Sequence, residues 1–176
     1  MTFLRSPRGI EGRARSFAES HFVSLIRLAG PQDIHRLREI DATTRDDPRG
    51  DDYFADACRA THDVQVESGE LALVLEDRDR VTGFVMCVRV LDEVSIHDIA
   101  IDASEQGRGL GRRLLQVVLE RFRDAGASRC LLEVRASNQV ALRLYRSCQF
   151  HLDGVRKNYY PVDGGREDAL LMSRAL

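Results

Sequence analysis

Apolar residues in the first part of the chain change from strand-like to helix-like spacing. Residues 22–28 alternate enough apolar side chains for a strand, before Gly30 and Pro31 interrupt the pattern. Apolar residues then recur at helical spacing within 33–40, which predicts a helix, and residues 53–60 fit a short second helix. The chain therefore begins with a predicted strand followed by two helices.

The middle of the chain reads as three consecutive strands. Residues 71–75 and 81–91 are rich in β-branched and apolar side chains, and they flank a polar linker of hairpin length at 77–80. A third strand is predicted over 93–101. Consecutive strands with such short connections favour an antiparallel meander.

The second half alternates helices with strands. Apolar residues follow helical spacing from residue 110 to residue 122, and Gly126 stands where a helix typically ends. The elements predicted after this helix are a strand over 129–135, a helix over 138–147 and strands near 150–157 and 167–173. The apolar faces predicted for the two helices are Leu114, Leu115, Val118, Leu119 and Phe122 for the first, and Ala141, Leu144, Tyr145 and Cys148 for the second.

The predicted order of elements, βααβββαβαββ, indicates an α/β fold with a mixed central sheet of about seven strands flanked by helices. Where two parallel neighbours splay apart, a ligand can enter near their carboxyl ends. The strand that ends at Ile101 and the strand that contains Glu133 are the candidates for such a pair.

Length and composition predict one domain. A chain of 176 residues with 43% hydrophobic content can form one ordinary core and is short for two, so we expect a single domain over residues 21–176. Residues 1–20 contain four arginines and lack the continuous apolar segment of a secretory signal, so we expect a mobile basic extension there. No stretch approaches the length of a membrane-spanning helix.

Charge and cysteine content narrow the class of protein further. A net charge of −2 gives no bulk attraction to nucleic acid or to an anionic membrane, so neither is an expected partner. The four cysteines contain no C-x-x-C pair, which speaks against a zinc site or a disulfide framework and favours reduced thiols in a cytoplasm. The histidines share no metal-ligand spacing, so no metal is expected.

A glycine- and arginine-rich segment, Gln106 to Arg112, separates the third strand of the meander from the helix that follows. The first backbone N–H groups of a helix have no partners within it, and glycine leaves them open to an anion. The segment completes neither a dinucleotide G-x-G-x-x-G nor a P-loop. It predicts a site for a phosphorylated ligand, with a plain tight turn as the alternative. The candidate residues are Gly107, Arg108, Gly109, Leu110, Gly111 and Arg112.

Several segments in order and register strengthen the first interpretation. They are Leu91–Glu93 leading into Asp98–Asp102, the Gln-x-x-Gly-x-Gly string at 106–111, Leu132–Asn138, Ala141–Tyr145, and Arg156–Pro161 with Gly165–Ala169. Together they resemble the RimI-type ribosomal-protein-alanine N-acetyltransferases of the GCN5-related N-acetyltransferase (GNAT) superfamily. The resemblance covers roughly Val90 to Met172 and implies a GNAT fold.

The resemblance implies acetyl-CoA as co-substrate and assigns its contacts. Backbone of Ile99, Ala100 and Ile101 would meet the pantetheine arm and the acetyl carbonyl, while Gly107 through Arg112 would hold the pyrophosphate. Asn138 would contact a pantetheine amide, which suits a side chain that both donates and accepts. Capping of the following helix is an equally weighted alternative for Asn138.

The resemblance also assigns two catalytic residues. Glu133 matches the general base, with pairing to Arg135 or another surface arginine as the alternative. Tyr145 matches the proton donor to the departing thiolate, with a helix-face tyrosine that anchors the core as the alternative. His97 and Asp98 are reserve acid–base candidates on the preceding strand, and Cys148 is expected to be a buried structural thiol.

The acceptor side follows the family less closely. Tyr159 and Tyr160, expected in a turn before the last strand, match the pair that lines the slot for a peptide N-terminus in the resembled enzymes. The chain lacks tryptophan and so lacks the Pro-Trp-Ser stretch usual after the first helix. Residues 44–52 instead carry an acidic cluster that would suit a basic acceptor or simply form a solvated turn. The cluster comprises Asp46, Asp47, Asp51 and Asp52.

The resulting hypothesis is direct transfer of acetyl from acetyl-CoA to a protein α-amine, the N-terminal alanine of a small-subunit ribosomal protein. One alternative keeps the chemistry and changes the acceptor to a small-molecule amine or a lysine side chain. Another is a non-catalytic regulator that binds acyl-CoA.

Overall fold

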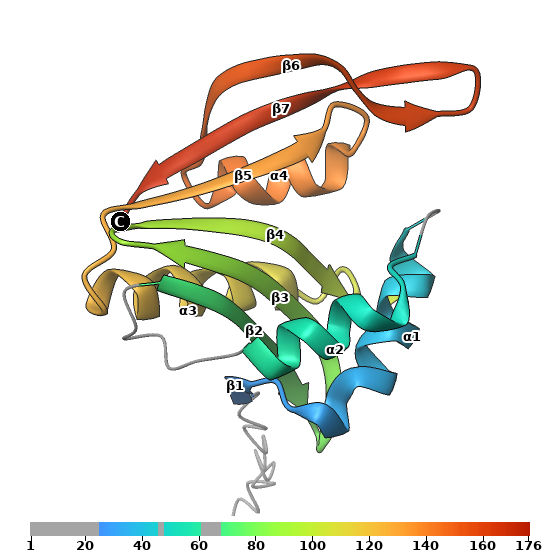
Figure 1. Cartoon of the computed structure of the whole chain (residues 1–176), viewed down its shortest axis with the longest axis vertical. Coiled ribbons are helices and arrows are strands. Elements are labelled where there is room, and N and C mark those ends of the chain that lie inside the picture. Colours follow the sequence, from blue (N-terminus) through green and yellow to red (C-terminus); the bar gives the residue numbers. More distant parts are fainter. Residues whose placement is uncertain (1–24, 46–47, 61–67) are drawn as a thin grey trace, which may run out of the picture.

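The computed structural model describes residues 25–45, 48–60 and 68–176, and within them the elements follow the predicted order (Figure 1). The strands are β1 Leu25–Leu28, β2 Ser68–Asp77, β3 Arg80–Val90, β4 Glu93–Ile101, β5 Arg129–Arg135, β6 His151–Val162 and β7 Gly165–Ala175. The helices are α1 Ile34–Thr44, α2 Asp51–Ala60, α3 Leu110–Asp124 and α4 Gln139–Ser147, with short 3₁₀ turns at Pro31–Asp33 and Ala103–Glu105. The predicted bounds of β4 and β5 are confirmed at both ends.

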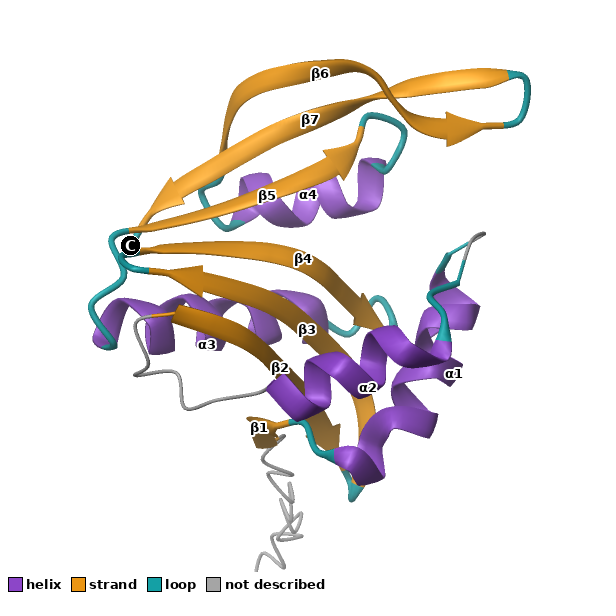
Figure 2. Ribbon diagram, viewed as in Figure 1, coloured by secondary structure: helices purple, strands orange, loops and turns teal. Residues whose placement is uncertain are grey.

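The strands of the described residues form one mixed sheet in the order β1-β2-β3-β4-β5-β7-β6. Every neighbouring pair is antiparallel except β4 and β5, which run parallel because α3 crosses over between them. The predicted meander of β2, β3 and β4 is confirmed. Helices α1 and α2 cover one face of the sheet, and α3 and α4 cover the other (Figure 2).

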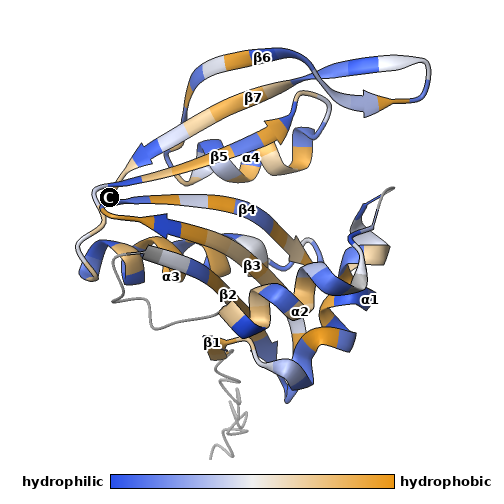
Figure 3. Cartoon of the chain, in the orientation of Figure 1, coloured by the Kyte–Doolittle hydropathy of each residue, from blue (hydrophilic) through white to orange (hydrophobic). Residues whose placement is uncertain are grey.

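The central strands are buried on both faces, which explains their continuous apolar sequence. Along β2, Leu71, Leu73 and Leu75 belong to the core beneath α3 and α4, while Ala72 and Val74 belong to the core beneath α1 and α2. The same strands are among the most hydrophobic parts of the chain in Figure 3, whereas polar residues predominate in the outer part of the β6–β7 hairpin. The α/β interpretation of the sequence is thus confirmed at the level of single side chains.

Helix α3 buries all five apolar residues predicted for its face, together with Leu110. It stops after Asp124, and Gly126 adopts the left-handed backbone conformation (φ +87°) that terminates many helices. Helix α4 differs from the prediction, because Leu142 is 1% exposed while Ala141 and Leu144 are only partly buried. The face of α4 is therefore rotated relative to the expected one, although Tyr145 lies on both.

Strands β4 and β5 are joined only over their first halves. Their parallel pairing covers residues 93–96 of β4 and 129–132 of β5. On its other side β4 bulges at His97, since Ile96 pairs with Cys87 and Asp98 with Met86 on β3. Beyond the bulge, β4 retains β3 as its strand partner and β5 retains β7, so the two inner edges separate. The predicted splay is present between the two strands expected to form it.

The β6–β7 hairpin corrects the expectation that Tyr159 and Tyr160 lie in a turn. Tyr159 and Tyr160 lie within β6, and the turn follows at Asp163 and Gly164. Proline at 161 suits this position because β6 is an edge strand of the described sheet. No further strand of that sheet lies on its outer side and needs an N–H donor there.

Some expectations fall outside the described residues. The basic extension over 1–20, the start of the first strand, Asp46 and Asp47 are among them. Among the described helices, none combines the length and apolar character needed to cross a membrane. Cys58, Cys87, Cys130 and Cys148 are all buried free thiols.

Candidate active site

The end of β4 lies beyond the point where β4 and β5 separate. Ile99, Ala100 and Ile101 form the end of β4 and pair with β3 alone. Because backbone groups of a strand alternate between its two edges, part of this segment's N–H and C=O groups point to the open edge. The side chains of Ile99 and Ile101 pack into the core beneath α3 and α4, so this edge is rigidly supported.

The start of α3 presents free backbone donors. Gly109, the residue before the helix, has φ +77° and provides no side-chain cap. The first N–H bonded back into the helix is that of Arg113, which donates to the Gly109 carbonyl at 3.1 Å. The N–H groups of Leu110, Gly111 and Arg112 therefore lie at an uncapped helix start. A Cβ added to Gly107 or Gly109 would meet nothing within 4 Å, so the approach to these donors is open.

The arginines of this segment are less available than their sequence position indicates. Arg108 forms ion pairs with Glu105 and with Asp77, the latter at 3.4 Å. Arg112 donates to the Ser147 carbonyl at 2.9 Å. The groups that this segment leaves available to an anion are therefore first its backbone donors, at the positive end of the α3 dipole.

Asp102 fixes the backbone just before the glycine-rich segment. Its Oδ1 accepts from the Ser104 N–H at 2.9 Å and from the Ser104 hydroxyl at 2.6 Å. Its Oδ2 is paired with Arg36 of α1 and, at 3.4 Å, with Arg80. The Ser104 hydroxyl and the Arg36 guanidinium lower the pKa of Asp102 to about 2. A buried carboxylate thus ties α1 to the approach of the candidate anion site.

Glu133 lies on β5 directly beyond the end of the β4–β5 pairing. Its side chain is 31% exposed, and its carboxylate forms an ion pair with Arg156 of β6 at 3.2 Å. Arg135 is engaged elsewhere, with Glu167 at 2.9 Å. The surface-arginine alternative is therefore realised through Arg156, while about a third of the carboxylate side chain stays exposed.

Tyr145 combines a core position with a reachable hydroxyl. The residue is 6% exposed, and its ring lies 5.8 Å from that of Phe150. Burial, with the negative charge of Asp98, raises the pKa of Tyr145. No hydrogen bond joins its hydroxyl to another described residue, yet among these residues no fully buried polar side-chain atom lacks a partner. The hydroxyl oxygen therefore keeps some contact with solvent.

Asp98, a reserve candidate, is fully engaged. Its carboxylate accepts from the Tyr53 hydroxyl at 3.0 Å, from Arg45 at 3.1 Å and from Arg49 at 3.2 Å. Three side chains from the α1–α2 region thus bind the Asp98 carboxylate. It therefore holds this region to β4 and is not a free base. Sequence reasoning missed this cluster, and the only signal for it is an acidic residue within an apolar strand. His97, the other reserve candidate, is the exposed bulge residue.

The tyrosine pair lies on the β6 side of the same region. The rings of Tyr159 and Tyr160 are 5.0 Å apart in an edge-to-face arrangement. Arg156 stacks over Tyr159 at 5.3 Å and Arg135 over Tyr160 at 4.5 Å. Burial and the charge of Glu133 raise the pKa of Tyr160, so its hydroxyl remains a donor at neutral pH.

Asn138 caps α4, since its Oδ1 accepts from the Ala141 N–H at 3.0 Å. The capping alternative is therefore observed. The amide nitrogen of Asn138 has no hydrogen-bond partner among the described residues and remains a possible donor to a ligand.

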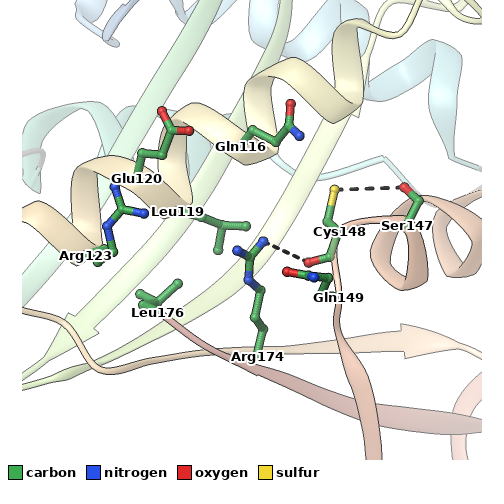
Figure 4. Close-up of a pocket in the computed structure, with 9 residues that line it drawn as sticks. All are labelled: Gln116, Leu119, Glu120, Arg123, Ser147, Cys148, Gln149, Arg174 and Leu176. Atoms are coloured by element: carbon green, nitrogen blue, oxygen red, sulfur yellow. Dashed lines mark hydrogen bonds between the residues drawn. The ribbon is translucent and has the colours of Figure 1, made fainter.

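A pocket of about 240 Å³ lies elsewhere, between the second half of α3, the end of α4 and the end of β7 (Figure 4). It contains none of the predicted site residues. Arg174 donates to the Cys148 carbonyl at 2.9 Å along its wall. Its position near Gln116 and Arg123 separates it from the glycine-rich start of α3, so it does not belong to the candidate site.

Comparison with known proteins places these features in a family. The model of the Acetyltransferase (GNAT) family matches residues 33–150. The [Ribosomal protein bS18]-alanine N-acetyltransferase of Salmonella typhimurium is 43% identical over 103 residues, which cover 58% of this chain and 70% of that protein. The enzyme of the same name from Escherichia coli is 40% identical over 99 residues, which cover 56% and 67% of the two chains.

Solved structures agree with this placement. The ribosomal-protein-S18-alanine N-acetyltransferase from Escherichia coli superposes with a TM-score of 0.77 and 31% identity over 86% of this chain and 93% of that one. Ard1 from Thermoplasma volcanium gives a TM-score of 0.73 and 25% identity over 87% and 97%. With the mixed seven-strand sheet of the described residues and a family match across most of the chain, the protein belongs to the GNAT family of N-acetyltransferases.

Proposed function

We propose that this enzyme transfers acetyl from acetyl-CoA to the α-amine of the N-terminal alanine of ribosomal protein bS18. The observation that supports the proposal is that Tyr160 lies within electrostatic reach of both Glu133 and Tyr145, and that Glu133 directly follows the end of the β4–β5 pairing. The 43% identity to an enzyme named for that reaction supports the choice of acceptor.

The donor site is proposed from residues that fit a phosphorylated thioester. The uncapped N–H groups of Leu110, Gly111 and Arg112 would hold the pyrophosphate, with Gly107 and Gly109 leaving room for it. The open edge over 99–101 and the free amide nitrogen of Asn138 would bond the pantetheine arm. When bound, acetyl-CoA supplies the activated acetyl group.

The catalytic step is direct attack in a ternary complex. Glu133 accepts a proton from the acceptor amine, directly or through water, as the new C–N bond forms and the C–S bond breaks. Backbone N–H groups at the open edge of β4 stabilise the negative charge on the carbonyl oxygen.

Tyr145 acts mainly as a hydrogen-bond donor to the departing sulfur. An ordinary phenol giving its proton to a thiolate is uphill by roughly 2 kcal/mol, because their pKa values are about 10 and 8.5. Burial raises the pKa of Tyr145 further, which makes complete proton transfer less favourable still. Partial charge stabilisation requires only contact.

An α-amine suits this site better than a lysine side chain. The pKa of an α-amine is roughly 8 and that of lysine about 10.4, so near neutral pH the α-amine is unprotonated more than a hundredfold more often. A single carboxylate base can therefore serve an N-terminus without first extracting a proton from a strongly basic ammonium.

The test uses the full chain with acetyl-CoA and four acceptors: a peptide with the bS18 N-terminus, the same peptide with a blocked α-amine, a lysine peptide and a polyamine. Mass spectrometry should find acetyl only on the free N-terminal alanine. Glu133→Gln should lose most of this turnover. Acetylation of the polyamine or lysine alone would overturn the acceptor, and acetyl-CoA binding without any turnover would indicate a regulator.

A further inference from the structure

Strand β6 leaves the regular ladder where it carries the two tyrosines. Arg156 and Tyr160 pair with residues of β7 that are only two positions apart, so three residues of β6 face the single residue Asp168. Neighbouring side chains of a regular strand point to opposite faces, yet the rings of Tyr159 and Tyr160 lie 5.0 Å apart. The bulge is therefore what brings both phenols to one place.

Two side chains from β7 hold this bulge in place of ladder bonds. Arg166 donates through Nε to the Asn158 carbonyl at 2.7 Å and through Nη2 to the Tyr159 carbonyl at 2.6 Å. Asp168 accepts from the Asn158 N–H at 2.9 Å. Asn158 has φ +53°, a left-handed conformation that asparagine adopts more readily than most other non-glycine residues.

The residue between them fastens the neighbouring loop. Glu167 pairs with Arg135 at 2.9 Å, and its other oxygen accepts from the Ser137 N–H at 3.2 Å. Arg135 in turn stacks over Tyr160. Three consecutive residues of β7 thus connect the tyrosine-bearing bulge with the loop that leads into α4.

We propose that Arg166 and Asp168 are positioning residues for the acceptor: they hold the bulge so that Tyr159 and Tyr160 jointly meet the peptide backbone behind the reacting amine. This rests on the proposed function of the tyrosine pair. The side chains of Arg166 and Asp168 bond to β6 and not to Glu133 or the start of α3, so replacing them should affect the acceptor and leave acetyl-CoA binding unchanged.

The test compares Arg166→Ala, Arg166→Lys and Asp168→Ala with Asp153→Ala. The control removes an ion pair of β6, the strand that carries the tyrosines, at its other end (Arg129 at 2.9 Å). The KM for the peptide should rise about tenfold or more in the first three variants, while the KM for acetyl-CoA and the melting temperature stay close to those of the unaltered enzyme. Lysine restores the charge of Arg166 but not its two fixed donors, so it should not rescue.

Hydrogen exchange of the Asn158 amide gives a readout that needs no turnover. Exchange should accelerate in Asp168→Ala and in both Arg166 variants, and remain unchanged in Asp153→Ala. An unaltered peptide KM in active Arg166→Ala would overturn the proposal, as would rescue by lysine. If the unaltered enzyme acetylates no N-terminal peptide, the proposed function fails, and the exchange rates then separately decide whether these residues hold the bulge.

Discussion

Replacing Asp102 by asparagine should destabilise the protein by about 2 kcal/mol at neutral pH. The carboxylate is buried and receives two hydrogen bonds from Ser104 and the guanidinium of Arg36. Lowering its pKa from 3.8 to about 2 corresponds to about 2 kcal/mol of stability in the ionised form. Asparagine preserves the shape and removes the charge, leaving Arg36 beside a neutral partner.

The pH dependence identifies the cause. A carboxylate whose pKa is depressed by folding stabilises the native state above its unfolded value, near 3.8, and loses that contribution as the pH falls through about 2. The difference between unaltered protein and Asp102→Asn should therefore be largest at pH 5 to 7 and shrink steadily toward pH 2.

The assay is urea unfolding of both proteins across this range, with Asp124→Asn as control. Asp124 pairs with Arg123 on the surface, its side chain being 71% exposed, so its loss should cost well under about 1 kcal/mol at every pH. A difference between unaltered protein and Asp102→Asn that stays constant from pH 7 to pH 2 would refute the electrostatic reasoning and point to altered packing.

Three further predictions separate structural from chemical roles. Tyr145→Phe should keep the melting temperature within a few degrees, because the ring stays in the core, and should lower kcat by about tenfold to a hundredfold; unchanged turnover would remove the hydroxyl from the mechanism. Gly109→Ala should raise the KM for acetyl-CoA and lower the free energy of unfolding in urea by about 1 kcal/mol, because φ +77° disfavours a Cβ. Gly111→Ala, whose Cβ meets its neighbours at 3.5 Å, should be no less stable than the unaltered protein. Equal stability of Gly109→Ala and the unaltered protein would contradict this reasoning. Leu142→Ala should cost about 2 to 5 kcal/mol by the same measurement, and a loss below 1 kcal/mol would show that the site refills.

Sequence reasoning succeeded where local pattern and burial coincide. The bounds of β4 and β5 and the buried face of α3 were predictable because each element alternates or repeats against a continuous core. Helix α4 has only nine residues, so its apolar pattern alone did not determine which side faces the core, and Leu142 proved to lie on the buried side.

The candidate site was likewise predictable only where its features depend on local sequence. The uncapped, glycine-rich start of α3 was predictable because it consists of local backbone. The position of the tyrosine pair was predicted wrongly, since the bulge in β6 is held by Arg166 and Asp168 from another strand. The partner of Glu133 was likewise open, because Arg156 reaches it across β7.

The open edge of β4 has a consequence for how such an enzyme changes over time. The proposed donor contacts lie mainly in the main chain, at the edge of β4 and the start of α3, and a point mutation rarely removes a peptide group. The proposed acceptor contacts are side chains, Tyr159 and Tyr160, on an edge strand held by other side chains. A lineage carrying this fold can therefore exchange acceptors through a few substitutions while the acetyl donor stays the same.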